Sequence, residues 1–376
     1  MAKDVIFSQA DFDLLRLLRW GRHILPESVD GLFPERDIQN LVALGLMKLH
    51  KRSGSYVLTA KGNQLLNATL STVAPDTPPS YRPGETLRRI RLSKLAVTAY
   101  RAHIQVFTTG LEDLSDSSTL FLPAIARGKG HNPWGNTRIA ALAHLGGQLC
   151  AMHYVCPGIG RISLADELAA FNNHAARFPG LRRAFILAGD TYGALMSELA
   201  EDDPEPARKL ITYGAAFRAL TLPVHLLSCD DIGAIQLQIM SVPDYRTRLT
   251  RAALRTHYRP PPEDVTAWDA VYGGGPFVLA VDMDLHRLDA AIRAATAQNC
   301  PQVAMAALKG QGEALLGRYR GMVRFYALTD AAVAEALGRS AALHMPARTQ
   351  FLTAKGDVVD APPIQTAGKA GGSSVQ

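Results

Sequence analysis

Apolar residues recur at helical spacing near the start of the chain. Phe12, Leu15 and Leu18 fall on one face of a predicted helix. Ser8 precedes them and is a residue type that caps helix N-termini. Pro26 opens a second, shorter helix, because proline is favoured at a first helical position. The pattern therefore begins with two helices.

A third helix, a hairpin and a fourth helix follow. Residues 34–45, "PERDIQNLVALG", return to helical spacing and end at a glycine. Two short β-like runs at 46–51 and 55–59 are joined by Arg52-Ser53-Gly54, and Gly62 leads into the next helix. The order helix, helix, helix, hairpin, helix over residues 1–70 is typical of a winged helix-turn-helix.

The middle of the chain alternates between helices and strands. Residues 71–86 are rich in Pro, Ser and Thr and predict a linker, and residues 87–107 predict a long helix. Two antiparallel strands turn at Gly146-Gly147. Further helices and buried strands alternate up to residue 240, which is the pattern of an α/β sheet.

The predicted fold class is α/β, with an N-terminal winged helix-turn-helix, an α/β domain and a further α/β stretch. The expected segments are a DNA-binding domain at 1–70, a linker at 71–86, an α/β domain at 87–240, a basic connector at 241–267, a second α/β stretch at 268–354 and a disordered tail at 355–376.

Composition and charge indicate a globular protein with an anionic partner. The 376 residues are 47% apolar, enough for a sizeable core, and the net charge of +6 favours an anionic partner. Four cysteines lack zinc-ribbon spacing and are expected to be reduced, partly buried thiols. The chain has neither a signal-peptide pattern nor a membrane-length apolar run, so a cytoplasmic location without membrane contact is expected.

Basic residues on the first two predicted domains, together with one glutamine, are candidates for contact with double-stranded DNA. They lie on the predicted recognition helix, on the hairpin and on the helix after the linker: Arg36, Gln39, Lys48, Lys51, Arg52, Lys61, Arg88, Arg89 and Arg91. Glu35 and Asp37 beside Arg36 fit an alternative in which the N-terminal domain contacts proteins.

A second basic set lies in the connector. It comprises Arg246, Arg248, Arg251, Arg255 and Arg259. These arginines either track phosphates or form an ordinary solvated helix face.

Catalytic signals in the sequence are few. Gly273-Gly274-Gly275 precedes a strand, whereas a phosphate-binding loop follows one. His144 and His153 lie on the predicted hairpin of the α/β domain, and Asp166 and Glu167 open a helix. Two carboxylates and two imidazoles are groups that can bind a divalent metal, although acidic residues at a helix start also act as caps.

The chain resembles a known family of mobile-element proteins. A winged helix that ends in Tyr-x-Leu-Thr-x-x-Gly, here Tyr56 to Gly62, is similar to the replication-relaxation proteins and the related MOBC-class relaxases of plasmids and conjugative elements. The following domain in that group resembles a restriction endonuclease core. In the present chain the hairpin, the helix at 165–178 and the later strands fall in the same order.

The resemblance implies a nuclease site that this chain does not keep intact. Active members of the nuclease fold hold Mg²⁺ or Mn²⁺ with an Asp and a Glu-x-Lys on adjacent strands. The matching strand here, "QLCAMHYV", has neither the carboxylate nor the lysine. Either Asp166, Glu167, His144 and His153 form a rebuilt catalytic site, or nicking activity has been lost.

The resulting hypothesis is a DNA-binding protein of a mobile element that acts at a transfer or replication origin, with or without nicking. Other mobilisation proteins and a second copy of the chain are further expected partners. The alternatives are a non-enzymatic transcriptional regulator with an α/β domain for ligand binding or dimerisation, and a protein-interaction module.

Overall fold

The computed structural model describes residues 6–70, 81–115, 118–123, 134, 137–156, 161–202, 209–263, 265–346, 351–353 and 358–359. The chain divides into two compact units. The first comprises residues 1–82 together with 345–376, and the second comprises residues 83–344. Helices and strands alternate in both, so the protein is a mixed α/β protein.

The first unit contains the predicted helices and hairpin in the predicted order. Its elements are β1 (Ile6–Ser8), α1 (Gln9–Gly21), α2 (Pro26–Val29), α3 (Glu35–Ala43), β2 (Met47–His50), β3 (Ser55–Leu58), α4 (Ala60–Thr69), β15 (Phe351–Thr353) and β16 (Val358–Val359). Strand β15 pairs with both β1 and β16, so the end of the chain joins its beginning in one sheet.

Local capping fixes where these helices begin. The Ser8 hydroxyl accepts a hydrogen bond from the Asp11 N–H, and the Asp11 carboxylate accepts one from the Ser8 N–H. This reciprocal pair is a capping box. Thr59 caps α4 in a similar way by accepting from the Gly62 N–H at 3.1 Å. The sequence prediction for Ser8 is therefore confirmed.

The hairpin is anchored to the helices at its base. Tyr56 exchanges two backbone hydrogen bonds with Ile24, at 2.7 and 3.1 Å, so a single β-bridge joins β3 to the segment between α1 and α2. A side chain at Gly62 would come within 2.2 Å of the Leu46 carbonyl oxygen. Only glycine therefore allows α4 to lie so close to β2.

The second unit holds two sheets and the helices around them. Its helices are α5 (Pro83–Arg101), α6 (Leu164–Ala175), α7 (Tyr192–Ala200), α8 (Tyr213–Ala219), α9 (Asp231–Met240), α10 (Tyr245–Leu254), α11 (Leu285–Ala297), α12 (Gly312–Arg318) and α13 (Asp330–Leu337). Short 3₁₀ turns occur at η1 (Glu112–Ser115), η2 (Arg255–His257) and η3 (Lys309–Gln311).

Its strands are β4 (Thr119–Phe121), β5 (Ile139–Leu145), β6 (Gln148–Tyr154), β7 (Arg161–Ile162), β8 (Arg182–Gly189), β9 (Ile211–Thr212), β10 (Val224–Ser228), β11 (Ala270–Tyr272), β12 (Gly275–Leu279), β13 (Val303–Ala307) and β14 (Val323–Ala327). The sequence interpretation did not include the short strands β4, β7, β9 and β11.

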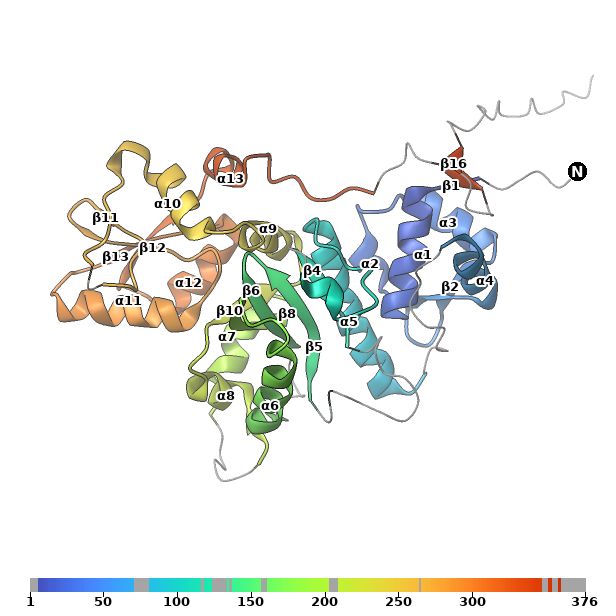
Figure 1. Ribbon diagram of the computed structural model, residues 1–376, viewed down its shortest axis with the longest axis horizontal. Helices are drawn as coiled ribbons and strands as arrows, with labels where there is room; N and C mark the ends of the chain where they lie inside the picture. The colour runs from blue at the N-terminus through green and yellow to red at the C-terminus, as the bar shows by residue number, and fades with distance from the viewer. Residues whose placement is uncertain are drawn as a thin grey trace, which may run out of the picture. The chain divides into compact units, whose positions relative to one another are not determined.

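The larger sheet has the strand order β10-β8-β6-β5-β4. Strands β6, β8 and β10 are parallel, whereas β4, β5 and β6 are joined in antiparallel fashion. Helices α6, α7 and α8 cover one face, and α5 and α9 cover the other (Figure 1). The predicted turn at Gly146-Gly147 is confirmed, and both residues have positive φ angles of 53° and 84°.

The smaller sheet has the order β11-β12-β13-β14, with β12, β13 and β14 parallel. Gly273 and Gly274, both with positive φ, make the tight turn from β11 into β12. The triple glycine is therefore a hairpin turn, in agreement with its exclusion as a phosphate loop.

A buried aspartate connects the two sheets. Asp282, 0% exposed, follows β12, and the adjacent Met283 carbonyl accepts a hydrogen bond from the Leu226 N–H of β10. The Asp282 carboxylate accepts from Arg246 Nε at 2.7 Å and from the Tyr245 hydroxyl at 2.6 Å. Arg287 Nη2 of α11 lies 3.6 Å from its second oxygen. The carboxylate thus ties α10 and α11 to the ends of β10 and β12.

The segment boundaries differ from the sequence expectation in three places. Helix α5 starts at Pro83, inside the predicted linker, and ends at Arg101, before His103 takes a positive φ of 60°. The predicted basic connector contains α10, which is packed by Tyr245 and Leu249. The two predicted α/β stretches lie in one compact unit. Most of the predicted linker and tail falls outside the described residues.

Replacing Arg246 with Met should destabilise the second unit strongly. The change leaves the buried Asp282 carboxylate without its closest cation, and loss of one partner from a buried ion pair costs about 3–5 kcal/mol. The exposed pair between Arg218 and Asp202, at 3.0 Å, provides the control. Arg218→Met should change the free energy of unfolding by less than about 1 kcal/mol. Urea unfolding followed by circular dichroism measures both, and equal effects would contradict the role given to Asp282.

Candidate functional site

The β2–β3 hairpin presents a concentration of positive charge. Lys48, Lys51 and Arg52 are all exposed on it. No Asp or Glu occurs between Leu46 and Lys61, so no carboxylate on the hairpin itself offsets these charges. The hairpin can therefore contact anionic groups such as the phosphates of DNA.

Lys61 has a structural role that the sequence interpretation missed. Its ammonium donates a hydrogen bond to the Leu44 carbonyl at 2.8 Å. Leu44 is the C-terminal cap of α3, where the helix dipole and the free carbonyls favour a cation. Lys61 is exposed as well, but its fixed position is explained by this contact.

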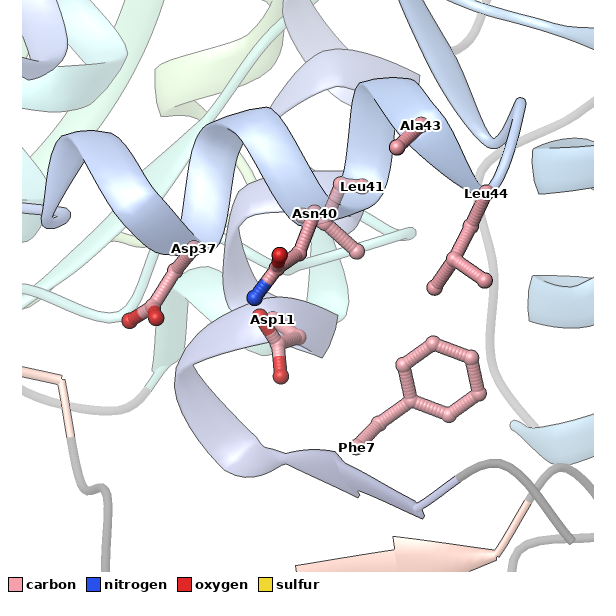
Figure 2. Close-up of a pocket in the computed structure, with 7 residues that line it drawn as sticks. All are labelled: Phe7, Asp11, Asp37, Asn40, Leu41, Ala43 and Leu44. Carbon is pink, nitrogen blue, oxygen red and sulfur yellow. The ribbon is translucent and has the colours of Figure 1, made fainter. Parts of the chain in front are cut away.

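The surface of α3 carries mixed charge. Arg36 is exposed, whereas the Gln39 amide donates to Glu35 Oε1 on the same helix at 2.9 Å. Next to them lies a pocket of about 310 Å³ lined by Phe7, Asp11, Asp37, Asn40, Leu41, Ala43 and Leu44 (Figure 2). Two carboxylates line this pocket, so this side of α3 repels phosphate.

The three predicted arginines on α5 differ in accessibility. Arg88 and Arg91 are half-buried, and Arg89 is only 6% exposed. Arg89 is one of the buried residues of α5, as is its neighbour Ile90. The expectation that Arg89 offers its guanidinium to a phosphate at the protein surface therefore does not agree with its burial.

The four predicted catalytic residues do not converge on one site. In the β5–β6 register His144 pairs with Leu149, whereas His153 pairs with Ile139. The two histidines share a face but lie four residues apart along the hairpin, which is about 13 Å at the usual rise of a strand. Asp166 is half-buried and forms an ion pair with Lys209 at 3.2 Å.

Glu167 and His153 do come together. Glu167 Oε2 lies 3.9 Å from His153 Nε2, and the two side chains are 2% and 1% exposed. The other Glu167 oxygen accepts a hydrogen bond from the Arg138 N–H at 2.6 Å. Neither ring nitrogen of His153 has a hydrogen-bond partner among the described residues. The pair is enclosed by the rings of Phe185 and Tyr213.

Burial shifts both groups toward their neutral forms. It raises the pKa of Glu167 to about 7, although the Arg138 N–H partly opposes the shift. It lowers the pKa of His153 to about 4. At neutral pH His153 is therefore uncharged and a large share of Glu167 is protonated.

This pair does not fit a divalent metal ion. Only one carboxylate and one imidazole converge, and Asp166 and His144 lie elsewhere. Mg²⁺ and Mn²⁺ prefer several oxygen ligands and keep water molecules, which a sealed site does not admit. The predicted rebuilt nuclease site at these four residues is therefore not supported by their placement.

One other group of metal-ligand side chains gathers in the described part of the chain. Donor atoms of His225, Asp282 and Asp284 lie within 4.8 Å of one another. Arg246 contacts both carboxylates, and Arg287 approaches Asp282 as well. Burial alone would raise the pKa of Asp282, but these two guanidinium groups hold it well below its usual range. The arginines already supply the positive charge that a metal ion would bring.

A more accessible polar group lies at the carboxyl ends of β6 and β8. Asp190 Oδ1 accepts hydrogen bonds from the Tyr154 hydroxyl and from the Lys94 ammonium, each at 2.6 Å. Partial burial would raise the pKa of Asp190, but Lys94 and Tyr154 hold it below its ordinary value. Asp190 is exposed, and this edge of a parallel sheet is where ligands commonly bind. In the sequence, only the position of Asp190 just after a buried strand indicated this site.

Comparisons with protein-family models, with curated proteins and with solved structures find no match to this chain. None of the helices in the described part of the chain combines the length and the apolar character needed to cross a bilayer.

Glu167→Gln should change stability in a pH-dependent way. Because the folded-state pKa is raised from 4.5 to about 7, the stability that Glu167 contributes is fully present below pH 4.5 and is lost as the pH rises to 7. The amide does not titrate, so the variant should gain up to about 3 kcal/mol relative to the wild type between these pH values. Urea unfolding at pH 4.5 and pH 7 measures the difference. The exposed Glu313→Gln controls for removal of one negative charge, and a pH-independent effect of Glu167→Gln would contradict the assignment.

Proposed function

We propose that this chain is a DNA-binding protein whose first unit contacts the phosphates of duplex DNA through the β2–β3 hairpin. The observation that carries the proposal is the exposure of Lys48, Lys51 and Arg52 on a hairpin without carboxylates. A positive net charge of +6 over the whole chain supports the same type of partner.

The element order of the first unit supports a winged-helix domain. Helices α1, α2 and α3 precede the hairpin, and a β-bridge between Ile24 and Tyr56 joins the hairpin to the segment after α1. In such domains the third helix enters the major groove. Asp37 and Asp11 lie on one side of α3, so we propose that the hairpin supplies most of the affinity and that sequence discrimination by α3 relies on Arg36, which is exposed.

The second unit supports a nuclease-like scaffold. The succession α5, β4, β5, β6, α6, β8 has the helix and strand order of a restriction endonuclease core, with an antiparallel hairpin followed by a parallel strand. Strand β6 lacks the carboxylate and lysine of active members, and Glu167 is sealed. We therefore propose that this unit supports DNA binding without the four-residue catalytic site expected from the sequence.

The biological setting of the proposal comes from the resemblance at Tyr56 to Gly62. We propose on that basis that the protein acts at a transfer or replication origin of a mobile element, with other mobilisation proteins or a second copy of the chain as partners. A transcriptional regulator with the same DNA-binding unit is the alternative. Binding to an origin fragment in preference to promoter fragments of the same element distinguishes the two.

Lys51→Ala combined with Arg52→Ala should weaken binding to all duplex sequences. Loss of two phosphate contacts should also reduce the slope of log K against log salt by about 2, since each contact contributes about 0.9. Fluorescence anisotropy with a labelled duplex across a salt series measures both quantities. The double variant Arg177→Ala with Arg182→Ala removes the same charge from exposed positions of the second unit and should leave the slope unchanged. Equal effects of the two double variants would contradict the hairpin interface.

A second candidate function is DNA nicking at the Asp190 site. The exposed carboxylate, the adjacent lysine and the nuclease-like strand order favour it. This candidate predicts that supercoiled DNA incubated with Mg²⁺ or Mn²⁺ is relaxed by the wild type and by Glu167→Gln but not by Asp190→Asn. Absence of relaxed circles, or their persistence with Asp190→Asn, would contradict it while leaving the DNA-binding proposal intact.

A further inference from the structure

An aromatic pocket lies on one face of the smaller sheet. It has a volume of about 200 Å³ and lies between the end of α10, the strands β12 to β14 and the start of α13. Phe277, Tyr272, Tyr326 and His257 contribute rings to its lining, and Ala327 and Ala332 contribute small side chains. The volume is below the roughly 300–1,000 Å³ of pockets for drug-sized ligands, so it suits a single ring system.

The rings of the lining are arranged edge to face. Tyr272 lies 6.0 Å from Tyr326 with an interplanar angle of 86°, and 6.4 Å from Phe277 at 70°. The His257 ring lies 6.2 Å from Tyr272 at 85°. The hydroxyl groups of Tyr272 and Tyr326 and the imidazole of His257 can form hydrogen bonds to the polar edge of a flat ligand that packs against these rings.

Positive charge is concentrated around this pocket. Arg255 and Arg259 lie two residues on either side of His257, and the Arg324 guanidinium lies 5.5 Å from the centre of the Tyr326 ring. All three arginines are exposed, and none forms an ion pair with a carboxylate within the described residues. Asp330, next to the lining residue Thr329, is the acidic neighbour on α13. The surroundings of an apolar, aromatic pocket thus favour a ligand with an anionic group.

We propose that this pocket binds a mononucleotide, with the base between the aromatic rings and the phosphate at Arg255, Arg259 and Arg324. Arg259 Nη1 donates to the Thr256 and Tyr258 carbonyls at 3.1 and 2.8 Å, and Arg324 lies over the Tyr326 ring. A purely apolar ligand would make no use of the positive charge of these arginines, and a phosphate alone would make no use of the aromatic rings. The site lies wholly in the second unit and does not depend on DNA binding by the hairpin.

Isothermal titration of the full chain with AMP, GMP, CMP and UMP in turn tests this assignment. At least one nucleotide should bind, and its nucleoside and inorganic phosphate should each bind at least about tenfold more weakly, since the two parts use separate contacts. Tyr326→Leu and Arg324→Gln should each weaken nucleotide binding by about tenfold. Ala327→Phe should abolish it by filling the pocket.

Control variants distinguish loss of this site from a general loss of positive charge and from unfolding. Arg320→Gln removes an exposed arginine ahead of β14, at its amino end, and should retain wild-type affinity for the nucleotide. Lys51→Ala with Arg52→Ala should also retain it, because the hairpin is not involved. Thermal unfolding of each variant without ligand shows that the pocket variants remain folded.

The outcomes that overturn the assignment are distinct. Binding of none of the four mononucleotides would reject it. Binding of a dT oligonucleotide that is weakened by Tyr326→Leu and Ala327→Phe, without binding of any mononucleotide, would reassign the pocket to single-stranded nucleic acid. Nucleotide binding that is unaffected by Tyr326→Leu, Arg324→Gln and Ala327→Phe would locate the ligand elsewhere.

Discussion

The buried carboxylate of Asp282 is the interaction on which the second unit depends most. A lone carboxylate in a protein interior is strongly unfavourable, and it persists only where cations and hydrogen-bond donors surround it. Arg246, Arg287 and the Tyr245 hydroxyl meet that requirement from two different helices. Because each of these groups must reach the same two oxygens, the carboxylate fixes α10 and α11 relative to the joined ends of β10 and β12. The position of the smaller sheet beside β10, the edge strand of the larger sheet, is held by the same carboxylate.

A set of buried amides extends the same connection. The Gln311 amide donates to the Val281 carbonyl at 2.8 Å and to Gln236 Oε1 at 3.1 Å, and the Tyr192 hydroxyl donates to that same oxygen. These side chains come from α7, α9 and the turn before α12, so the network links the helices of both sheets. Satisfied buried networks of this kind select one arrangement over others, because any displacement leaves a polar group without a partner. The pocket at β12 to β14 and the Asp190 site are held on elements fixed by this network.

Charge is distributed differently inside and outside the protein. Carboxylates such as Asp282 and Glu167 are buried and are either neutralised by arginines or shifted toward the protonated form. Exposed arginines and lysines instead gather on the β2–β3 hairpin and around the aromatic pocket. The buried pair of Glu167 and His153 has a packing role between α6 and the larger sheet. A catalytic role does not fit, because neither solvent nor substrate reaches the pair. The functional proposals therefore rest on the two basic surfaces and on the exposed Asp190.

Elements with local causes could be predicted from the order of residues alone. Ser8, Pro26 and Gly146-Gly147 act through their own backbone and neighbours, so the helix starts and the β5–β6 turn could be predicted without tertiary contacts. The positive charge of the hairpin could also be predicted from the sequence, because no acidic residue lies between its basic residues. Contacts between residues far apart in the chain became known only from the folded structure. The strand register places His144 and His153 far apart along the hairpin. Packing of α5 buries Arg89. The Lys61 ammonium donates a hydrogen bond to the Leu44 carbonyl at the end of α3. Contacts between residues far apart in the chain depend on how whole elements pack, and residue spacing along the sequence does not encode that packing.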